Sequence, residues 1–209
     1  PKTIIATLVD IDDVGGTDPE EFQQKYRALI DKDFNGVHIG FWPKQSWKGE
    51  YSYDFASINP VINWAYDKGL TVTASFFFGP VQYMPTWLVD SGSGKSAAEL
   101  ERVMEGYIKA ALQSNNNANK IDVLAVVNEP FWVPGVGSNE GYVSTFWNGL
   151  GWEDDQSGLR GEAAPLTRHP VYIRKAFEFA KKYAPNIKLE IRERRVDGPE
   201  TLGDIGDHY

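Results

Sequence analysis

Cysteine is missing from all 209 residues, which excludes disulfides, thiolate metal sites and a thiol nucleophile. Runs of about 18 apolar residues, the length that crosses a bilayer, are also missing, so we expect no membrane-spanning segment. Basic residues are fewer than acidic ones, 21 against 29, and the net charge of −8 argues against nucleic acid and anionic membranes as partners. A neutral polymer such as a polysaccharide fits this charge.

Cofactor and metal motifs are equally scarce. No Gly-x-Gly-x-x-Gly sequence follows an apolar strand and no Walker loop is present, so we predict no nucleotide or other cofactor. Asp10, Asp12 and Asp13 lie close together, but they lack the glycine and bidentate glutamate of a calcium loop. We therefore predict no metal site. The N-terminus leads straight into an apolar strand, and no signal peptide is visible.

Short apolar strands alternate with amphipathic helices along the chain, a pattern typical of βαβ units around a parallel sheet. The strands are apolar almost throughout, as expected when both faces are covered. Because no nucleotide motif is present, we predict an α/β fold of the (β/α)8 TIM-barrel type rather than a doubly wound sheet. One domain would span residues 1–209, with about six of the eight strands present. The predicted strands are 3–9, 36–39, 70–78, 121–127 and 187–191, and the helices 18–31, 57–68, 97–113 and 171–183.

Several aromatic and histidine side chains invite a specific interpretation. Four tryptophans fall on loops after predicted strands, which in a barrel build the active-site face; they are Trp42, Trp47, Trp87 and Trp132. Flat rings suit the apolar faces of sugars, so we predict that they are sugar platforms. His38 lies within a strand and is predicted to be a hydrogen-bonded core residue, and His169 a helix cap. The barrel interior is expected to contain Leu8, Val37, Phe77 and Leu124.

Asn128-Glu129-Pro130 follows the fourth predicted strand directly. Glycoside cleavage needs a carboxylic acid that protonates the leaving oxygen and a second group that attacks or activates water. A glutamate at the C-terminal end of a barrel strand lies where such chemistry occurs, and the neighbouring asparagine can hydrogen-bond a sugar hydroxyl. Taken alone, the tripeptide is better explained as an Asn-Glu pair that caps a turn before Pro130.

Short motifs in a fixed order along residues 34–209 resemble glycoside hydrolase family 10, the β-1,4-xylanases. Besides Asn128-Glu129-Pro130, the matching segments are 34–37, 49–55, 85–87, 172–177, 185–189 and 205–209. The resemblance implies a retaining endo-β-1,4-glycan hydrolase that is extracellular, with xylan as the first substrate. It implies Glu129 as acid/base and His208 as the support of the nucleophile. Substrate contacts would come from Asn128, Lys44, Gln82 and the four loop tryptophans.

The nucleophile of that family, a glutamate after the seventh strand, has no counterpart within these 209 residues. Three arrangements are open: further residues of the same chain, a partner chain that completes the barrel, or a shortened barrel that uses Glu193 or Glu190. The first is favoured because an open barrel leaves strand edges and core exposed.

Some positions depart from the family pattern and keep other functions open. Gly40-Phe41 stands where the family has a sugar-binding Glu-Asn pair. One alternative is therefore a related barrel glycosidase that acts on β-glucan or mannan. The other is a non-catalytic carbohydrate-binding protein on a degenerate glycosidase scaffold.

Overall fold

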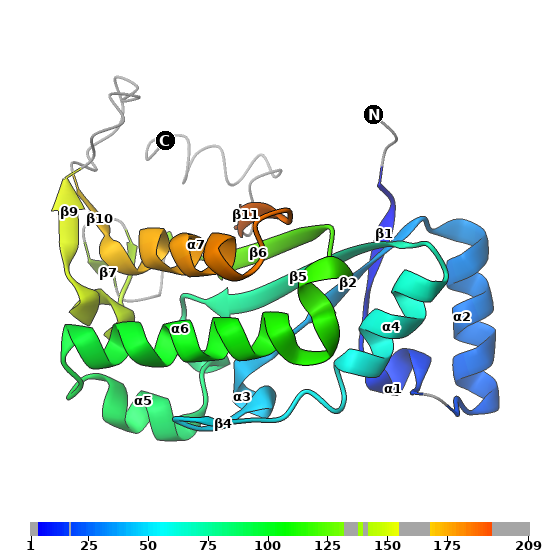
Figure 1. Cartoon of the computed structure of the whole chain (residues 1–209), viewed down its shortest axis with the longest axis horizontal. Coiled ribbons are helices and arrows are strands. Elements are labelled where there is room, and N and C mark those ends of the chain that lie inside the picture. Colours follow the sequence, from blue (N-terminus) through cyan, green and yellow to red (C-terminus); the bar gives the residue numbers. More distant parts are fainter. Residues whose placement is uncertain (1–3, 17, 132–137, 140–141, 155–167, 194–209) are drawn as a thin grey trace.

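A five-stranded parallel sheet forms the centre of the computed structural model, which describes residues 4–16, 18–131, 138–139, 142–154 and 168–193. The strands are adjacent in the order in which they follow one another along the chain (Figure 1), as in the wall of a barrel. They are β1 (Ala6–Val9), β2 (Gly36–Gly40), β5 (Thr71–Phe78), β6 (Val123–Asn128) and β11 (Lys188–Arg192). The predicted partial barrel is confirmed for these five strands. The sixth predicted strand, near residue 205, lies outside the described residues.

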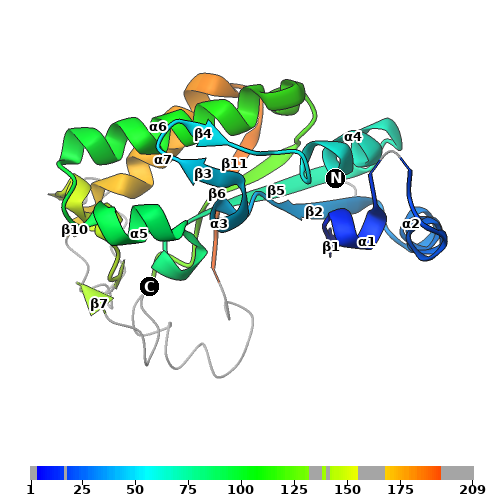
Figure 2. The same cartoon turned by 90° about the horizontal axis from the view of Figure 1, so that it is seen from below.

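Four longer helices accompany the sheet: α2 (Glu21–Asp33), α4 (Asn59–Asp67), α6 (Ala97–Gln113) and α7 (Val171–Tyr183). Figures 1 and 2 show α4, α6 and α7 on one face of the sheet and α2 beside its β1 edge. Ser96 starts α6 with a capping box, because it exchanges backbone-to-side-chain hydrogen bonds with Glu99. The predicted bounds of α6 and α7 are confirmed.

Shorter elements fill the connections. They are α1 (Ile11–Val14), α3 (Pro43–Ser46), α5 (Thr86–Gly92), the 3-10 turns η1 (Val81–Tyr83), η2 (Ser114–Asn119) and η3 (Phe146–Leu150), and the paired strands β3 (Trp47–Gly49) with β4 (Ser52–Tyr53), β7 (Ser138–Asn139) with β8 (Tyr142–Val143), and β9 (Trp152–Asp154) with β10 (Arg168–Pro170). The prediction that His169 caps a helix was wrong. It lies in β10, where its Nε2 is 3.0 Å from Oε1 of Glu153.

The two faces of the sheet differ in polarity. Side chains alternate between faces along a strand, and Leu8, His38 and Thr73 are partners in register on one face. We call this the inner face, because no described helix covers it. Val37 and Leu124 were predicted on it, but that prediction was wrong. Both are fully buried in the apolar core of the opposite, helix-covered face.

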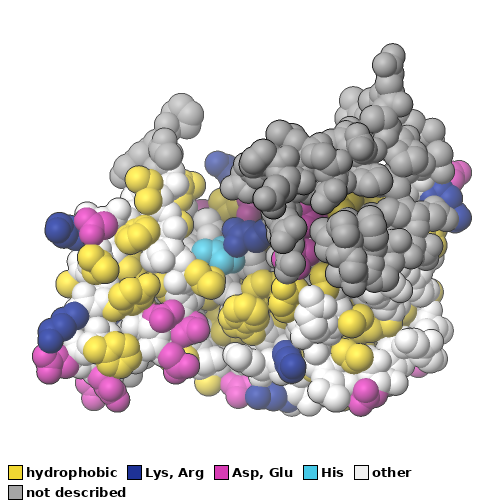
Figure 3. Space-filling view, turned by 180° about the vertical axis from the view of Figure 1, so that it is seen from behind, with side chains coloured by type: hydrophobic (Ala, Val, Ile, Leu, Met, Phe, Trp, Pro, Cys, Tyr) yellow, Lys and Arg dark blue, Asp and Glu magenta, His cyan; other side chains and the backbone are white. Residues whose placement is uncertain are grey.

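The inner face is only partly covered by the described residues. Figure 3 views the molecule from this side, where hydrophobic groups surround a histidine and a basic side chain. Leu8 on this face is 55% exposed, and Ile4, just before β1, is also exposed. Within the described residues, β1 and β11 are the edges of the sheet. Phe22 and Leu29 of α2 expose further apolar surface.

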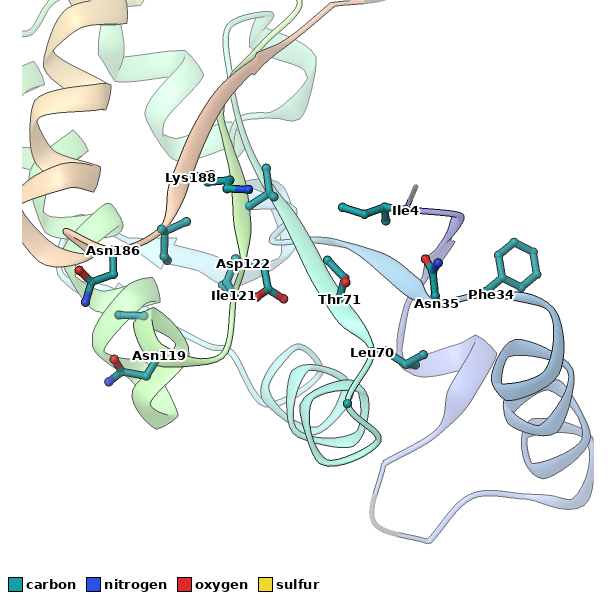
Figure 4. A pocket seen from close by; sticks show the side chains of 14 residues that line it. Ile4, Phe34, Asn35, Leu70, Thr71, Asn119, Ile121, Asp122, Asn186 and Lys188 are labelled. Atoms are coloured by element: carbon teal, nitrogen blue, oxygen red, sulfur yellow. The ribbon is translucent and has the colours of Figure 1, made fainter. Parts of the chain in front are cut away.

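A cavity of about 720 Å³ opens at the N-terminal ends of the strands (Figure 4). Its walls combine apolar Ile4, Leu70 and Ile121 with polar Asn35 and Asp122. The strands of a parallel sheet all point the same way, so this cavity lies at the end opposite Glu129. Among the described helices, none has the length and apolar character to cross a membrane.

Candidate active site

The C-terminal ends of β2, β5 and β6 share an unusual backbone conformation. Trp42, Phe77 and Glu129 have φ values of 39°, 58° and 48°, in the left-handed region. In the described chain only two other non-glycine residues have positive φ, Asn115 and Asn116, and asparagine tolerates it well. Such strain costs on the order of 1–3 kcal/mol per residue and concentrates at functional sites. The strained backbone therefore marks this end of the sheet as the candidate active site.

Glu129 is positioned by its backbone as well as by its strand. It follows Asn128, the last residue of β6, and its N–H donates to the carbonyl of Arg192 on β11 at 2.7 Å. The sheet register also shifts near this end, between Ser75 and Phe78 and between Glu190 and Ile191. Such bulges re-aim side chains next to active sites.

Gly79 allows the ends of β5 and β6 to approach closely. Its φ is 148°, and a Cβ at this position would lie 2.1 Å from the carbonyl oxygen of Asn128. No other residue type fits both the conformation and the space. The backbone beside Glu129 is thus in direct contact with the loop that follows β5.

Three aromatic rings, those of Trp42, Phe77 and Tyr83, form what we call the aromatic platform. Trp42 stacks on Phe77 with ring centroids 4.4 Å apart and an interplanar angle of 14°. Tyr83 lies 5.2 Å from Phe77 and 6.5 Å from Trp42. The indole folds back over Gly40, where a Cβ would meet its Nε1 at 2.5 Å. Glycine at position 40 therefore admits the ring.

The aromatic platform reaches the carboxylate through Tyr83. Its hydroxyl donates to Oε2 of Glu129 at 3.4 Å. Both side chains are half-buried, and Asn128 is 4% exposed. A carboxyl group beside rings and a buried amide combines a proton donor with surfaces that suit a sugar.

A second carboxylate, that of Glu193, lies just past the end of β11. It is half-buried, and its Oε2 accepts a hydrogen bond from the N–H of Phe131 at 3.2 Å. Glu193 also affects the fully buried hydroxyl of Tyr172. The pKa of that hydroxyl is raised mainly by burial, and then by Tyr142 and Glu193. Glu190 pairs with Arg192 at 3.5 Å. The role of Glu193 as an alternative nucleophile stays a prediction.

His38 is the centre of a polar network on the inner face. Its Nδ1 lies 2.9 Å from Oγ1 of Thr73, and its Nε2 lies 3.0 Å from Oγ of Ser75 and 2.6 Å from Nη1 of Arg192. The Thr73 hydroxyl donates to the Val37 carbonyl, so it accepts from Nδ1. Burial first, and then Arg192, lower the pKa of His38 to about 4. The imidazole is therefore neutral, and the predicted hydrogen-bonded core histidine is confirmed.

The prediction that Trp47 is a sugar platform was wrong. Trp47 is 1% exposed and stacks on Tyr107 at 4.6 Å, so it has no ring face for a ligand. Trp87 is half-buried in α5 and donates its Nε1 to the carbonyl of Trp47 at 3.1 Å. Its role in binding stays a prediction.

The remaining predicted contacts are divided between described and undescribed residues. Lys44 in α3 and Gln82 in η1 are exposed and follow β2 and β5 at the same end of the sheet as Glu129. Trp132 and His208 lie outside the described residues. Sequence reasoning missed Tyr83, and it placed Phe77 in the barrel interior without assigning it to the site. Tyr83 directly follows Gln82, and a run of three phenylalanines at 76–78 must direct at least one ring to the inner face, because side chains alternate.

The close spacing of Asp10, Asp12 and Asp13 is explained by the start of helix α1. Oδ1 of Asp10 accepts from the N–H groups of Asp12 and Asp13, and Asp13 accepts from the N–H of Asp10, which is a capping box for α1. No group of histidine, aspartate and glutamate side chains in the part of the chain that the structure describes could hold a metal ion.

The family model of glycosyl hydrolase family 10 matches residues 12–201. No curated protein sequence matches the chain. Solved structures do match it in fold. A thermostable mutant of a xylanase from Cellvibrio japonicus has a TM-score of 0.68 at 19% identity, over 99% of this chain and 55% of that one. Xylanase B from Clostridium stercorarium F9 has a TM-score of 0.67 at 16% identity, over 98% and 56%.

A third structure is a mutant of P fluorescens subsp. cellulosa xylanase A in complex with xylopentaose, with a TM-score of 0.63 at 19% identity, over 99% of this chain and 55% of that one. The chain thus spans little more than half the length of these solved structures. At identities below 20%, the likeness establishes a shared barrel fold.

Proposed function

We propose, from the premise that this chain belongs to glycosyl hydrolase family 10, that it supplies the acid/base residue of a retaining endo-β-1,4-glycan hydrolase acting on xylan. The observation that carries the proposal is the placement of Glu129 at the end of β6, beside the aromatic platform. The P fluorescens xylanase A structure holds xylopentaose, which supports a xylo-oligosaccharide as ligand here.

Glu129 would act first as an acid and then as a base. In a retaining mechanism it protonates the glycosidic oxygen as a second carboxylate attacks the anomeric carbon, and the bond to the leaving sugar breaks. Glu129 then takes a proton from the water that hydrolyses the glycosyl-enzyme. The second carboxylate would lie about 5–5.5 Å from Glu129.

The second carboxylate would come from polypeptide that completes the barrel. The exposed Ile4, Leu8 and Ile191 and the edges β1 and β11 support this view, because apolar surface and open edges are costly in water. We favour further residues of the same polypeptide over a partner chain, and an extracellular location suits a polysaccharide substrate. A shortened barrel would instead depend on Glu193.

Two other functions stay in consideration. Gly40 and Phe41 present no polar side chain at the end of β2. If hydrogen bonds from this position select xylose, their absence favours a related glycosidase that acts on β-glucan or mannan. Without a second carboxylate in range of Glu129, the molecule would bind carbohydrate and not cleave it.

The decisive experiment compares Glu129→Gln with Glu21→Gln, a control at an exposed glutamate on α2. Both are assayed in the complete protein on xylohexaose and on an aryl β-xyloside whose leaving group needs no proton. We expect Glu129→Gln to lower xylohexaose hydrolysis by roughly 10²–10⁴-fold and aryl xyloside hydrolysis much less. Unchanged xylohexaose hydrolysis would remove Glu129 from the mechanism.

A further inference from the structure

Trp42 and Tyr83 keep part of their rings accessible, and both rings pack against the ring of Phe77. Phe77 is 8% exposed, whereas Trp42 and Tyr83 are half-buried. The rings come from three different segments: the residues after β2, the end of β5, and η1. Rings that are already fixed by packing lose little conformational freedom when a ligand binds. The aromatic platform is thus prepared for a ligand that offers an apolar face.

The strained backbone shows that the position of these rings is specified. Trp42 and Phe77 adopt left-handed φ, although bulky residues pay for this conformation and glycine would not. Gly40 leaves the space into which the indole folds. A cluster needed only for core packing would not require strain at a half-exposed tryptophan.

The Tyr83 hydroxyl joins the aromatic platform to the reacting group. It donates to Oε2 of Glu129 at 3.4 Å, so a sugar on the platform lies next to the carboxyl. Ligand sites of this kind combine apolar and aromatic walls with a few polar groups that fix orientation. The hydroxyl is placed to orient the carboxyl, which leaves the ring for contact with a ligand.

We propose that Trp42 and Tyr83, supported by Phe77, bind the pyranose next to the scissile bond and select sugars whose hydroxyls are all equatorial. In β-xylose and β-glucose units the axial positions carry only hydrogens, so both faces of the ring are apolar. The axial 2-hydroxyl of mannose places a polar group on one face, which a platform of rings desolvates without a hydrogen bond. Tyr83 is in addition a positioning residue for Glu129, a role that rests on the proposed function.

Binding can be measured without turnover. In the complete protein carrying Glu129→Gln, calorimetry with xylohexaose, cellohexaose and mannohexaose should give measurable affinity for the first two and at least tenfold weaker affinity for the third. Trp42→Ala and Tyr83→Ala should each weaken xylohexaose binding by roughly tenfold, about 1.4 kcal/mol. Tyr66→Ala, at a 51% exposed tyrosine on α4, is the control and should bind as the parent does.

The positioning role of Tyr83 has its own signature. In the enzyme with Glu129 intact, Tyr83→Phe keeps the ring and should lower kcat with KM unchanged, whereas Tyr83→Ala should also raise KM. A lower kcat with restored KM in the phenylalanine variant distinguishes positioning from loss of structure. An unchanged kcat in Tyr83→Phe would overturn the positioning role.

Several results would overturn the aromatic platform itself. They are equal affinity for mannohexaose and xylohexaose, unchanged binding by folded Trp42→Ala, or no binding of any hexasaccharide. If Trp42→Ala does not fold, Trp42→Leu, which keeps apolar volume but no ring, must show the same loss. Because binding is measured with Glu129 already replaced, a failure of Glu129 as the acid leaves this test intact, and the two proposals fail separately.

Discussion

The Nη1 atom of Arg192 lies 2.6 Å from Nε2 of His38, although β5 and β6 separate their strands in the sheet. Three strand spacings in a flat sheet would place the two backbones about 14 Å apart. Side chains from β2 and β11 can meet in this way when the sheet curls toward its inner face. The contact therefore joins two distant strands and stabilises the curvature of the partial barrel.

The first prediction concerns stability in acid and rests on the pKa of His38. Its pKa is about 4 in the folded chain, below its ordinary value of 6.5, so between these values the unfolded chain binds a proton that the folded chain does not. Stability should fall as pH falls from 6.5 to 4, by about 3 kcal/mol in total. Below pH 4 this group adds no further loss.

Urea unfolding at pH 7, 5.5 and 4.5 measures this effect. His38→Gln removes the titrating group and should flatten the dependence, whereas His169→Gln, at the surface pair with Glu153, should retain it. Parallel curves for wild type and His38→Gln would show that His38 does not link folding to pH.

Gly79→Ala should destabilise the protein more than Gly69→Ala. Both glycines have positive φ, but an added Cβ meets the Asn128 carbonyl at 2.1 Å in the first case and nothing within 4 Å in the second. Each backbone conformation costs an alanine on the order of 1–3 kcal/mol, and φ is less favourable at Gly79 (148°) than at Gly69 (70°), so the larger loss reports both this φ and the close approach of β5 and β6. Chemical denaturation of the two variants provides the comparison. Equal losses would mean that the backbones at this end can separate without cost.

Trp47→Ala should lower stability by about 3–5 kcal/mol, the usual cost of deleting a large buried aromatic side chain. Trp47 is 1% exposed and packs against Tyr107 and Trp147. Trp47→Phe should recover much of the loss. A stable Trp47→Ala variant with weakened oligosaccharide binding would restore the discarded interpretation of Trp47 as a sugar platform.

The 209-residue chain on its own should associate in solution. Leu8 and Ile4 on the inner face and Phe22 on α2 are all about half exposed, and apolar surface beside an open strand edge promotes pairing. Light scattering and intact mass give the size. A 23.4 kDa monomer that unfolds cooperatively and cleaves glycan would contradict this prediction, and Glu193→Gln would then test the remaining nucleophile.

Secondary structure was predictable where local signals agree. The amphipathic pattern of residues 97–113 predicted α6, and the structure starts this helix with the capping pair Ser96 and Glu99. The faces of the strands were harder, because β6 is apolar on both sides and alternation alone does not say which side carries helices. Val37 and Leu124 were therefore assigned to the inner face, whereas polar His38, Thr73 and Ser75 occupy it.

The site was predictable at Glu129 and not at its neighbours. Trp42 and Trp47 both follow β2 and look equivalent in sequence, but β3 and β4 carry Trp47 into the core, while left-handed backbone turns Trp42 over Gly40. Tertiary packing makes that distinction, and no local pattern does. Tyr83 belongs to the site because η1 brings its hydroxyl to a carboxylate 46 residues further along the chain.

The left-handed backbone at Trp42, Phe77 and Glu129 would suit glycine better than it suits the side chains that the site needs. Replacing any of the three by glycine would relieve torsional strain, yet each replacement would delete a ring or a carboxylate. Selection for thermostability alone would therefore favour loss of the site, one strand end after another. A survey of tolerated substitutions at positions 42, 77 and 129 should therefore show glycine accepted under selection for folding and rejected under selection for ligand binding.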